Sequence, residues 1–264
     1  MYYDVHTHAF HPKIAEKVVE QLHGHYGISA VGTGLTDDLL ERASRAGLDR
    51  VVIHTAATEP DQVIPANNWS IELAKSDERI ITFGTMHPDY ADPEKEFARL
   101  ERNGIKGLKF HPDFQGFFMD EKRFYRILEM VQGRFVVMFH VGDKLPPEKN
   151  PSCPIKLRKI LENFPDLTCI AAHMGGYCHW QWASEELAGF NVYMDTSSAI
   201  PFMDRLVLRE IVNKHPRERI LFGSDYPLFD PGQTMKDFQQ ALNLKDSEME
   251  IHLSAAENLF AELN

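Results

Sequence analysis

The sequence is poor in cysteine and has neither long apolar runs nor an excess of basic residues. Its three cysteines are an odd number and form no CxxC pair, which argues against a disulfide framework and against zinc held by thiolates. No stretch approaches about 18 uninterrupted apolar residues, so we expect no membrane-spanning helix. The first residues lack the basic and apolar regions of a secretory signal, and we therefore expect a cytoplasmic protein.

Acidic residues outnumber basic ones, 39 to 28, which gives a formal net charge of −11. Nucleic acids and acidic membrane surfaces bind clustered lysine and arginine, so this balance argues against both as partners. A small-molecule substrate is compatible with it, because the local charge of a cleft can differ from that of the whole chain.

Eight short runs of apolar and β-branched residues recur along the chain, with stretches of helical period between them. The expected strands span residues 2–9, 50–57, 79–86, 105–111, 134–141, 167–174, 190–197 and 219–225. The expected helices include residues 36–46, 93–103, 120–132, 154–163 and 204–214, and an additional C-terminal helix at 246–262.

Eight strands that alternate with helices predict a parallel sheet, because a parallel connection needs a crossover and the crossover is usually a helix. Eight strands can close a (β/α)8 TIM barrel, and 264 residues match the usual length of about 250. An open doubly wound sheet is the alternative, but no GxGxxG follows any strand. No linker divides the chain, so we expect a single α/β barrel domain over residues 1–264, with the C-terminal helix across one end.

Titratable residues stand at the carboxyl ends of the expected strands, which is where a barrel enzyme builds its site. They are His6, His8, His54, His87, Lys109, His111, His140, His173, Asp195 and Asp225. His6 and His8 are two positions apart on a strand, so both imidazoles can face one cation. This pair is the sharpest indication of a metal site.

His140 alone would more often be a core residue, whereas Asp225, directly after an apolar strand, needs a cationic partner to offset desolvation. Together with His6 and His8 they predict a divalent metal site that suits zinc, with manganese and iron as alternatives. His173 is then left to donate a proton or polarise a substrate, or to bind a second metal. Asp195 could orient a ligand or simply end a strand.

The order of these residues resembles the amidohydrolase superfamily, and most closely the branch that includes the aminocarboxymuconate semialdehyde decarboxylase group. The strings that carry the resemblance are DVHTHAF at 4–10, GLKFHP at 107–112, HVG at 140–142, AHMGG at 172–176, FGSDYP at 222–227 and ENLF at 257–260. They span essentially the whole chain in the family's order. The resemblance is therefore specific for the superfamily and weak for the substrate.

The resemblance implies four metal ligands, namely His6, His8, His140 and Asp225. It makes His173 the catalytic histidine of a one-metal site or a ligand in a two-metal site. In two-metal relatives the lysine that matches Lys109 is carboxylated and bridges the ions. Lys109 could instead hold a substrate carboxylate, or extend from the strand end without a function. We favour one metal.

The predicted function is metal-dependent hydrolysis of an amide, ester or lactone bond in a small molecule. Asp225 would accept the proton of a metal-activated water and pass it to the leaving group, while His173 would polarise the scissile carbonyl. The alternative is metal-dependent non-oxidative decarboxylation at the same site, with Lys109 or Lys144 as the cationic group. A barrel that only keeps a structural metal is a third hypothesis.

Aromatic residues follow the fourth and sixth expected strands, and we expect them to contact the substrate. They include Phe114, beside His111, in the first of these loops, and Tyr177 and Trp180 in the second. Rings in such loops suit a planar or apolar substrate. They could equally belong to a lid or an interface between two copies, so a homodimer is also compatible with the sequence.

Overall fold

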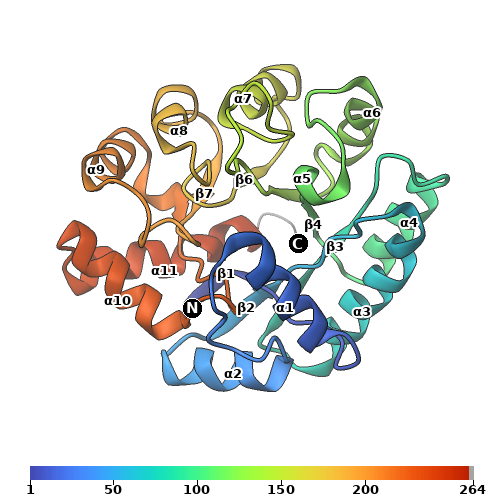
Figure 1. The fold of residues 1–264 in the computed structure, drawn as a ribbon. Helices are drawn as coiled ribbons and strands as arrows, with labels where there is room; N and C mark the ends of the chain where they lie inside the picture. Colours follow the sequence, from blue (N-terminus) through green and yellow to red (C-terminus); the bar gives the residue numbers. More distant parts are fainter. Residues whose placement is uncertain (262–264) are drawn as a thin grey trace.

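The computed structural model of the protein describes residues 1–261. Eight strands form one sheet, and each strand pairs in parallel with the next strand along the chain. They are β1 (Tyr3–Thr7), β2 (Arg50–Ile53), β3 (Ile80–Thr85), β4 (Gly107–Phe110), β5 (Val136–Phe139), β6 (Cys169–Ala171), β7 (Tyr193–Asp195) and β8 (Ile220–Leu221). Figure 1 shows them at the centre of a ring of helices, which confirms the (β/α)8 barrel.

Helices connect successive strands and cover the outside of the sheet (Figure 1). They are α1 (Ala15–Tyr26), α2 (Thr36–Arg45), α3 (Val63–Ser76), α4 (Pro93–Arg102), α5 (Pro112–Gln115), α6 (Lys122–Val131), α7 (Pro154–Asn163), α8 (Trp180–Glu186), α9 (Arg205–Lys214), α10 (Pro231–Leu242) and α11 (Asp246–Ala261), with 3-10 turns η1 (Pro60–Gln62) and η2 (Arg217–Arg219). The expected helices correspond to α2, α4, α6, α7, α9 and α11. Within residues 1–261, no helix is both long enough and apolar enough to cross a membrane.

The seam between β8 and β1 closes the barrel, although β8 has only two residues. Beyond it, the backbone N–H of Asp225 donates to His6 O (2.8 Å), and the N–H of His8 donates to Tyr226 O (2.7 Å). The chain after β8 therefore runs alongside β1. This seam brings Asp225 next to two histidines from the other end of the sequence.

The barrel interior is filled by an apolar cluster that includes Val5, Phe83 and Met138. Ala256 and Leu259 of α11 belong to the same cluster, so α11 covers the end of the barrel at which the strands begin. The expected C-terminal helix across one end is thereby confirmed. Its expected last residue, 262, lies outside the described residues.

Several strands are shorter than the sequence predicts, because the chain turns sharply beyond them. The expected strand 167–174 ends at Ala171 as β6, and the expected strand 219–225 ends at Leu221 as β8. His173 and Asp225 then have left-handed φ angles of 61° and 65°. The site residues consequently lie on turns directly after the strands rather than within them.

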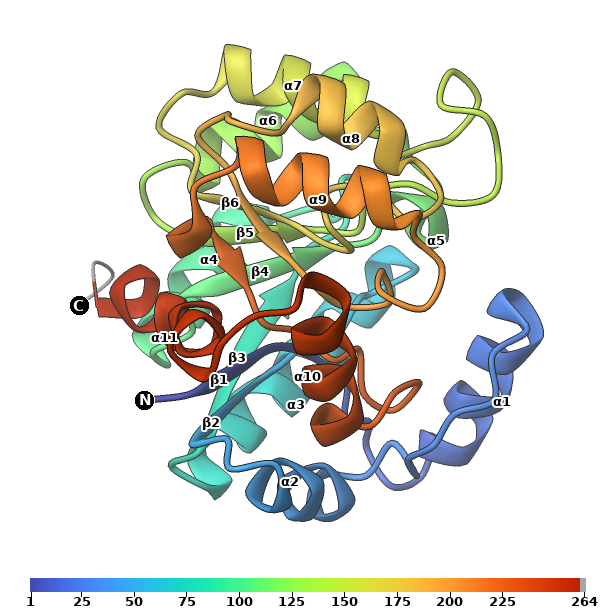
Figure 2. The same cartoon turned by 90° about the vertical axis from the view of Figure 1, so that its left-hand side faces the viewer.

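Helix α1, which the sequence analysis did not expect, stands apart from the ring at the carboxyl-terminal mouth of the barrel (Figure 2). Ala15 is the one residue of α1 that is buried. A helix with no wide apolar face packs weakly against a core, so α1 depends on specific contacts for its position.

Candidate active site

A cluster of titratable side chains occupies the mouth of the barrel, and all but His8 are buried. The cluster consists of His6 on β1, His8 directly after it, Lys109 on β4, His140 after β5, His173 after β6, Asp195 at the end of β7 and Asp225 after β8. The sequence analysis predicted that strand ends would bring these residues together, and the barrel does so.

His6, His8 and Asp225 form a compact group of donor atoms. Nε2 of His6 lies 3.6 Å from Oδ1 of Asp225, and Nε2 of His8 lies 3.3 Å from the same oxygen. Two donors on a tetrahedral zinc, each at about 2.05 Å, are about 3.3 Å apart. The three residues therefore have the spacing and the chemistry to hold one divalent cation.

Both imidazoles are oriented to present Nε2 as an acceptor. Nδ1 of His6 donates to Oδ2 of Asp195 (3.0 Å), and Nδ1 of His8 donates to His54 O (3.2 Å). A neutral imidazole has one N–H, so a proton on Nδ1 leaves the lone pair on Nε2. Burial lowers the pKa of His6 well below its usual value and keeps the ring neutral. This is the arrangement expected of metal-binding histidines.

Asp225 is held in place by its backbone and by Ser198. Its left-handed backbone turns the carboxylate into the mouth, and the hydroxyl of Ser198 donates to Oδ2. Burial alone would raise the pKa of Asp225, but positive charge on His6, His8 and His173 outweighs it and holds the pKa below its usual range. The ionised carboxylate therefore needs either a protonated imidazole or a bound cation beside it.

Asp195 and Ser197 connect the two halves of the site. The hydroxyl of Ser197 lies 3.0 Å from Nδ1 of His6 and 2.9 Å from Nδ1 of His173, and it donates to Asp195. Asp195 also accepts the backbone N–H of His173 (3.3 Å). The carboxylate thus orients His6 and the turn that carries His173, which is the ligand-orienting role that the sequence offered as one option for Asp195.

His173 and His140 face each other, with Nε2 of His173 3.0 Å from Nδ1 of His140. Nε2 of His140 lies 2.8 Å from Gly142 O, which can only accept, so this nitrogen carries the proton. Nδ1 of His173 likewise lies 3.0 Å from Ser197 O, so a neutral His173 carries its proton on Nδ1. When both rings are neutral, the lone pairs of Nδ1 of His140 and Nε2 of His173 face each other, so a further proton or a cation is needed between them. His173 can act as a proton donor from Nε2 in its protonated form.

Of the four predicted metal ligands, His140 is the one that lies outside the compact donor group. Both of its ring nitrogens have protein partners, and its ring stacks on His111 with centroids 3.8 Å apart. As a ligand, His140 would present to the cation its Nδ1, the nitrogen that faces His173. The assignment of His140 as a ligand stays a prediction.

Lys109 is buried beside the donor group, with Nζ 3.2 Å from Nε2 of His6. Burial lowers its pKa to about 8, although Asp195 and Asp225 oppose the change. An amine with this pKa is still mostly protonated at pH 7, but a cation bound next to it would favour the neutral form. A lysine buried this deeply does not extend into solvent.

The predicted substrate contacts line one side of the mouth. The ring of His111 stacks on Phe114 with centroids 3.9 Å apart and planes at 2°. Tyr177 is buried, and its ring lies 6.0 Å from that of His173. Trp180 packs 5.9 Å from Tyr177, and its indole N–H donates to His173 O (2.9 Å). Trp180 therefore supports the turn of His173 as well as the aromatic wall.

Sequence reasoning missed Ser197, Ser198 and Tyr26. The two serines follow the seventh strand in the string TSS, and small hydroxyl residues at a barrel strand end are the signal that could have identified them. Tyr26 comes from α1, and its hydroxyl lies 3.3 Å from Nε2 of His111. No pattern in the sequence places that tyrosine at the mouth.

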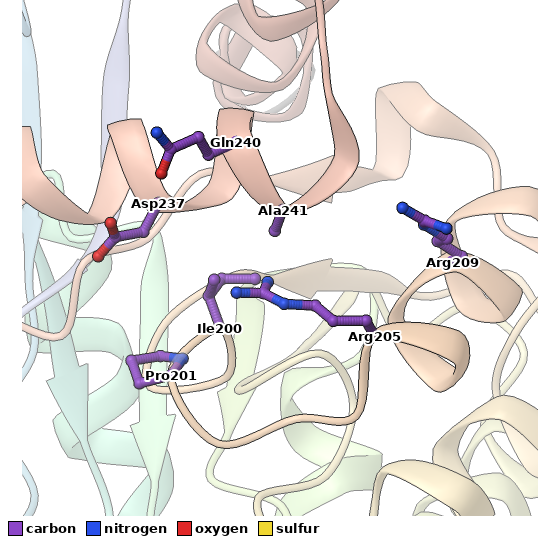
Figure 3. A pocket seen from close by; sticks show the side chains of 7 residues that line it. All are labelled: Ile200, Pro201, Arg205, Arg209, Asp237, Gln240 and Ala241. Carbon is purple, nitrogen blue, oxygen red and sulfur yellow. The ribbon is translucent and has the colours of Figure 1, made fainter.

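A separate groove of about 550 Å³ lies between α9 and α10, with Arg205 and Arg209 on one side and Asp237 on the other (Figure 3). Its lining contains none of the clustered histidines or carboxylates of the mouth. We therefore place the candidate site at the mouth and not in this groove.

Solved structures with the same fold include an uncharacterised TIM-barrel protein from Bordetella bronchiseptica, 16% identical, with a TM-score of 0.79 and 99% of each chain covered. An amidohydrolase from Burkholderia multivorans with bound zinc is 15% identical, with a TM-score of 0.73 and 99% of each chain covered. A dihydroxybenzoic acid decarboxylase from Polaromonas sp. with bound manganese is 14% identical, with a TM-score of 0.69, covering 100% of this chain and 97% of that one. Identities this low establish the fold alone.

No curated protein matches the chain. A family model described as Amidohydrolase matches residues 3–258, nearly the whole length, and confirms the resemblance drawn from the strand-end motifs. The chain therefore belongs to the amidohydrolase family and is an enzyme of that superfamily.

Proposed function

We propose that this protein is a metal-dependent hydrolase that cleaves an amide, ester or lactone bond in a small molecule. The observation that carries the proposal is the group formed by His6, His8 and Asp225, whose donor atoms stand 3.3 and 3.6 Å apart. Its carboxylate is also positioned to take a proton. His140 completes the proposed ligand set, and zinc is the metal that we favour, with manganese and iron as alternatives.

A divalent cation held by His6, His8, His140 and Asp225 would supply an acidified water, with a pKa of about 7 for zinc. Oδ2 of Asp225, which accepts from Ser198, would receive a proton from that water and deliver it to the leaving group. In its protonated form, His173 would donate from Nε2 toward the oxygen of the scissile carbonyl as negative charge develops there. Ser197 and Asp195 hold the ring of His173 and its turn in position for this step.

The cationic groups of the site favour hydrolysis over decarboxylation. Decarboxylation at this mouth calls for a free cationic side chain next to the substrate carboxylate, and Lys109 and Lys144 were its candidates. Lys109 is buried against His6, and Nζ of Lys144 donates to His25 O (2.7 Å) at the rim. Lys144 is therefore engaged at the rim, and the proposed cation on His6 disfavours the charged form of Lys109 next to it.

The position of Lys109 also bears on the number of metals. Its amine reaches His6, a ligand that we assign to the first cation, and burial brings its pKa to about 8. We propose one metal per chain, with Lys109 as a buried neutral amine rather than a carboxylated bridge. A carboxylated Lys109 would instead accompany a second metal, and metal counting distinguishes the two.

The test is a substrate screen with defined metal content. Protein stripped with a chelator and then reloaded with zinc, manganese or iron is assayed against amides, esters and lactones, and in parallel against aromatic carboxylic acids for release of carbon dioxide. We expect hydrolysis that depends on the metal and is lost in Asp225→Asn. Asp237→Asn, a partly buried carboxylate of α10 that lies outside the mouth, is the matched control and keeps full activity. Carbon dioxide release without hydrolysis, or turnover that survives chelation, contradicts the proposal.

A further inference from the structure

We propose that Tyr26, which α1 carries across the mouth of the barrel, contacts the substrate and selects substrates that bear a planar ring. The inference rests on the proposed function, because it assigns a substrate preference to the same site. The reaction steps above use no residue of α1, so this helix needs a separate explanation.

Helix α1 is fixed to the far side of the mouth through its last turn. Nε2 of His25 lies 2.9 Å from Oδ2 of Asp143, and Nζ of Lys144 donates to His25 O (2.7 Å). The ring of His25 also meets Phe114 edge-on, with centroids 4.8 Å apart. A segment that follows β1 is thereby attached to the loops after β4 and β5. Helix α1 consequently bridges the mouth (Figures 1 and 2).

Tyr26 lies at the inner end of this bridge, between the two aromatic loops. Its ring stands edge-on to Tyr177, with centroids 5.8 Å apart and planes at 87°, and 6.1 Å from Phe114. Its hydroxyl reaches His111. The loops after β4 and β6 form two walls of the mouth, and the ring of Tyr26 contacts an aromatic residue of each.

His111 links Tyr26 to the reacting groups. The ring of His111 stacks on His140, and His140 is hydrogen-bonded to His173. Tyr26 therefore stands only two side chains away from the proposed catalytic histidine. A substrate that presents its scissile carbonyl to His173 extends its remaining atoms toward the Tyr26 ring.

The chemistry of Tyr26 indicates which substrates gain from it. Burial raises the pKa of its phenol well above the ordinary value, and Asp225 and Asp143 add to the rise, so the hydroxyl keeps its proton. Tyr26 can then donate a hydrogen bond and offer a ring edge at the same time. A flat ring next to a carbonyl or carboxylate uses both, whereas a short aliphatic chain reaches neither.

The test compares two carboxylates that differ by a ring. Benzoate and acetate present the same headgroup to the metal-loaded enzyme, and their affinities are measured by titration calorimetry. We expect Tyr26→Ala to weaken the binding of benzoate about tenfold, because one or two ring contacts and a hydrogen bond are lost. The affinity for acetate should change by less than about twofold. Tyr26→Phe keeps the ring, and its affinity for benzoate should fall by about threefold or less. Tyr125→Phe, whose ring packs on Phe164 away from the mouth, is the matched control.

Each outcome decides the proposal. A wild-type enzyme without preference for benzoate overturns it, and so does equal weakening of both carboxylates in Tyr26→Ala. Metal content and melting temperature are measured on every variant, so that a change in affinity is not mistaken for misfolding. If the ester and amide screen shows no hydrolysis while Tyr26→Ala still weakens the binding of benzoate, the hydrolase proposal fails and the role of Tyr26 stands.

Discussion

The most informative perturbation of this site is Asp195→Asn, because it changes one hydrogen-bond direction and little else. Oδ1 of Asp195 accepts the backbone N–H groups of His173 (3.3 Å) and Ser197 (2.9 Å). An asparagine can keep both bonds by placing its amide oxygen there. Its NH2 group then faces Nδ1 of His6, from which the native carboxylate accepts a hydrogen bond (3.0 Å).

Two donors cannot face each other, so the His6 proton must move to Nε2, the atom that we assign to the metal. The variant then binds the cation only at the expense of the preferred tautomer or of a buried unpaired N–H. Substitutions of residues that orient a metal ligand typically weaken metal binding by about 10- to 100-fold, or about 1.4–2.8 kcal/mol. We expect Asp195→Asn to fall in this range.

The assay is a zinc titration in competition with a chromophoric chelator, followed by turnover measured at saturating zinc. Asp237→Asn provides the same chemical change at a carboxylate outside the mouth and is expected to leave zinc affinity unchanged. Circular dichroism and a melting curve establish that the barrel remains folded. A zinc affinity of Asp195→Asn within about twofold of the wild type would refute the tautomer argument, because the ligand would then not depend on the carboxylate.

Three further predictions follow from individual contacts. Lys109→Met should leave the metal content, measured by elemental analysis, at one ion per chain, and a fall from two ions to one would establish a bridging lysine. Asp143→Ala removes the partner of His25 and should speed amide exchange in α1 without changing exchange in β5. Burial raises the pKa of Asp113 to about 6, so the folded state binds a proton there more tightly than the unfolded chain does. The resulting stabilisation of the folded state is fully present below about pH 4 and is lost as the pH rises through 6. Urea unfolding from pH 4 to 7 should show that Asp113→Asn lacks this decline, which is about 3 kcal/mol at most; equal slopes for both proteins would contradict the assignment.

The sequence was sufficient for the fold and for the main residues of the mouth, because both depend on strong local patterns. Apolar runs that alternate with amphipathic stretches leave few alternatives to a barrel once eight are present. His6, His8 and Asp225 were identifiable because polar groups at the end of a buried strand are costly without a partner. These signals do not require knowledge of which strands are neighbours.

The remaining features depend on contacts between distant segments, and for that reason the sequence did not reveal them. Ser197 bridges His6 and His173 only because β7 and the seam bring three parts of the chain together. The hydrogen bonds of His140 likewise depend on the position of the β6 turn. Helix α1 escaped prediction because it buries one residue, and a helix held by a few polar contacts has no periodic pattern to detect.

The backbone of the site carries strain that only its side chains explain. His173, Ser198 and Asp225 have φ angles of 61°, 47° and 65°, a left-handed region in which a non-glycine residue costs on the order of 1–3 kcal/mol. Glycine would relieve that strain at each position, but each of these side chains contacts another group of the mouth. The barrel therefore sustains three unfavourable turns that aim the two groups proposed to react and the serine that holds one of them. Strain at these positions is what we expect of the preorganised site proposed above, whereas a purely structural metal site at the end of a barrel has no need of it.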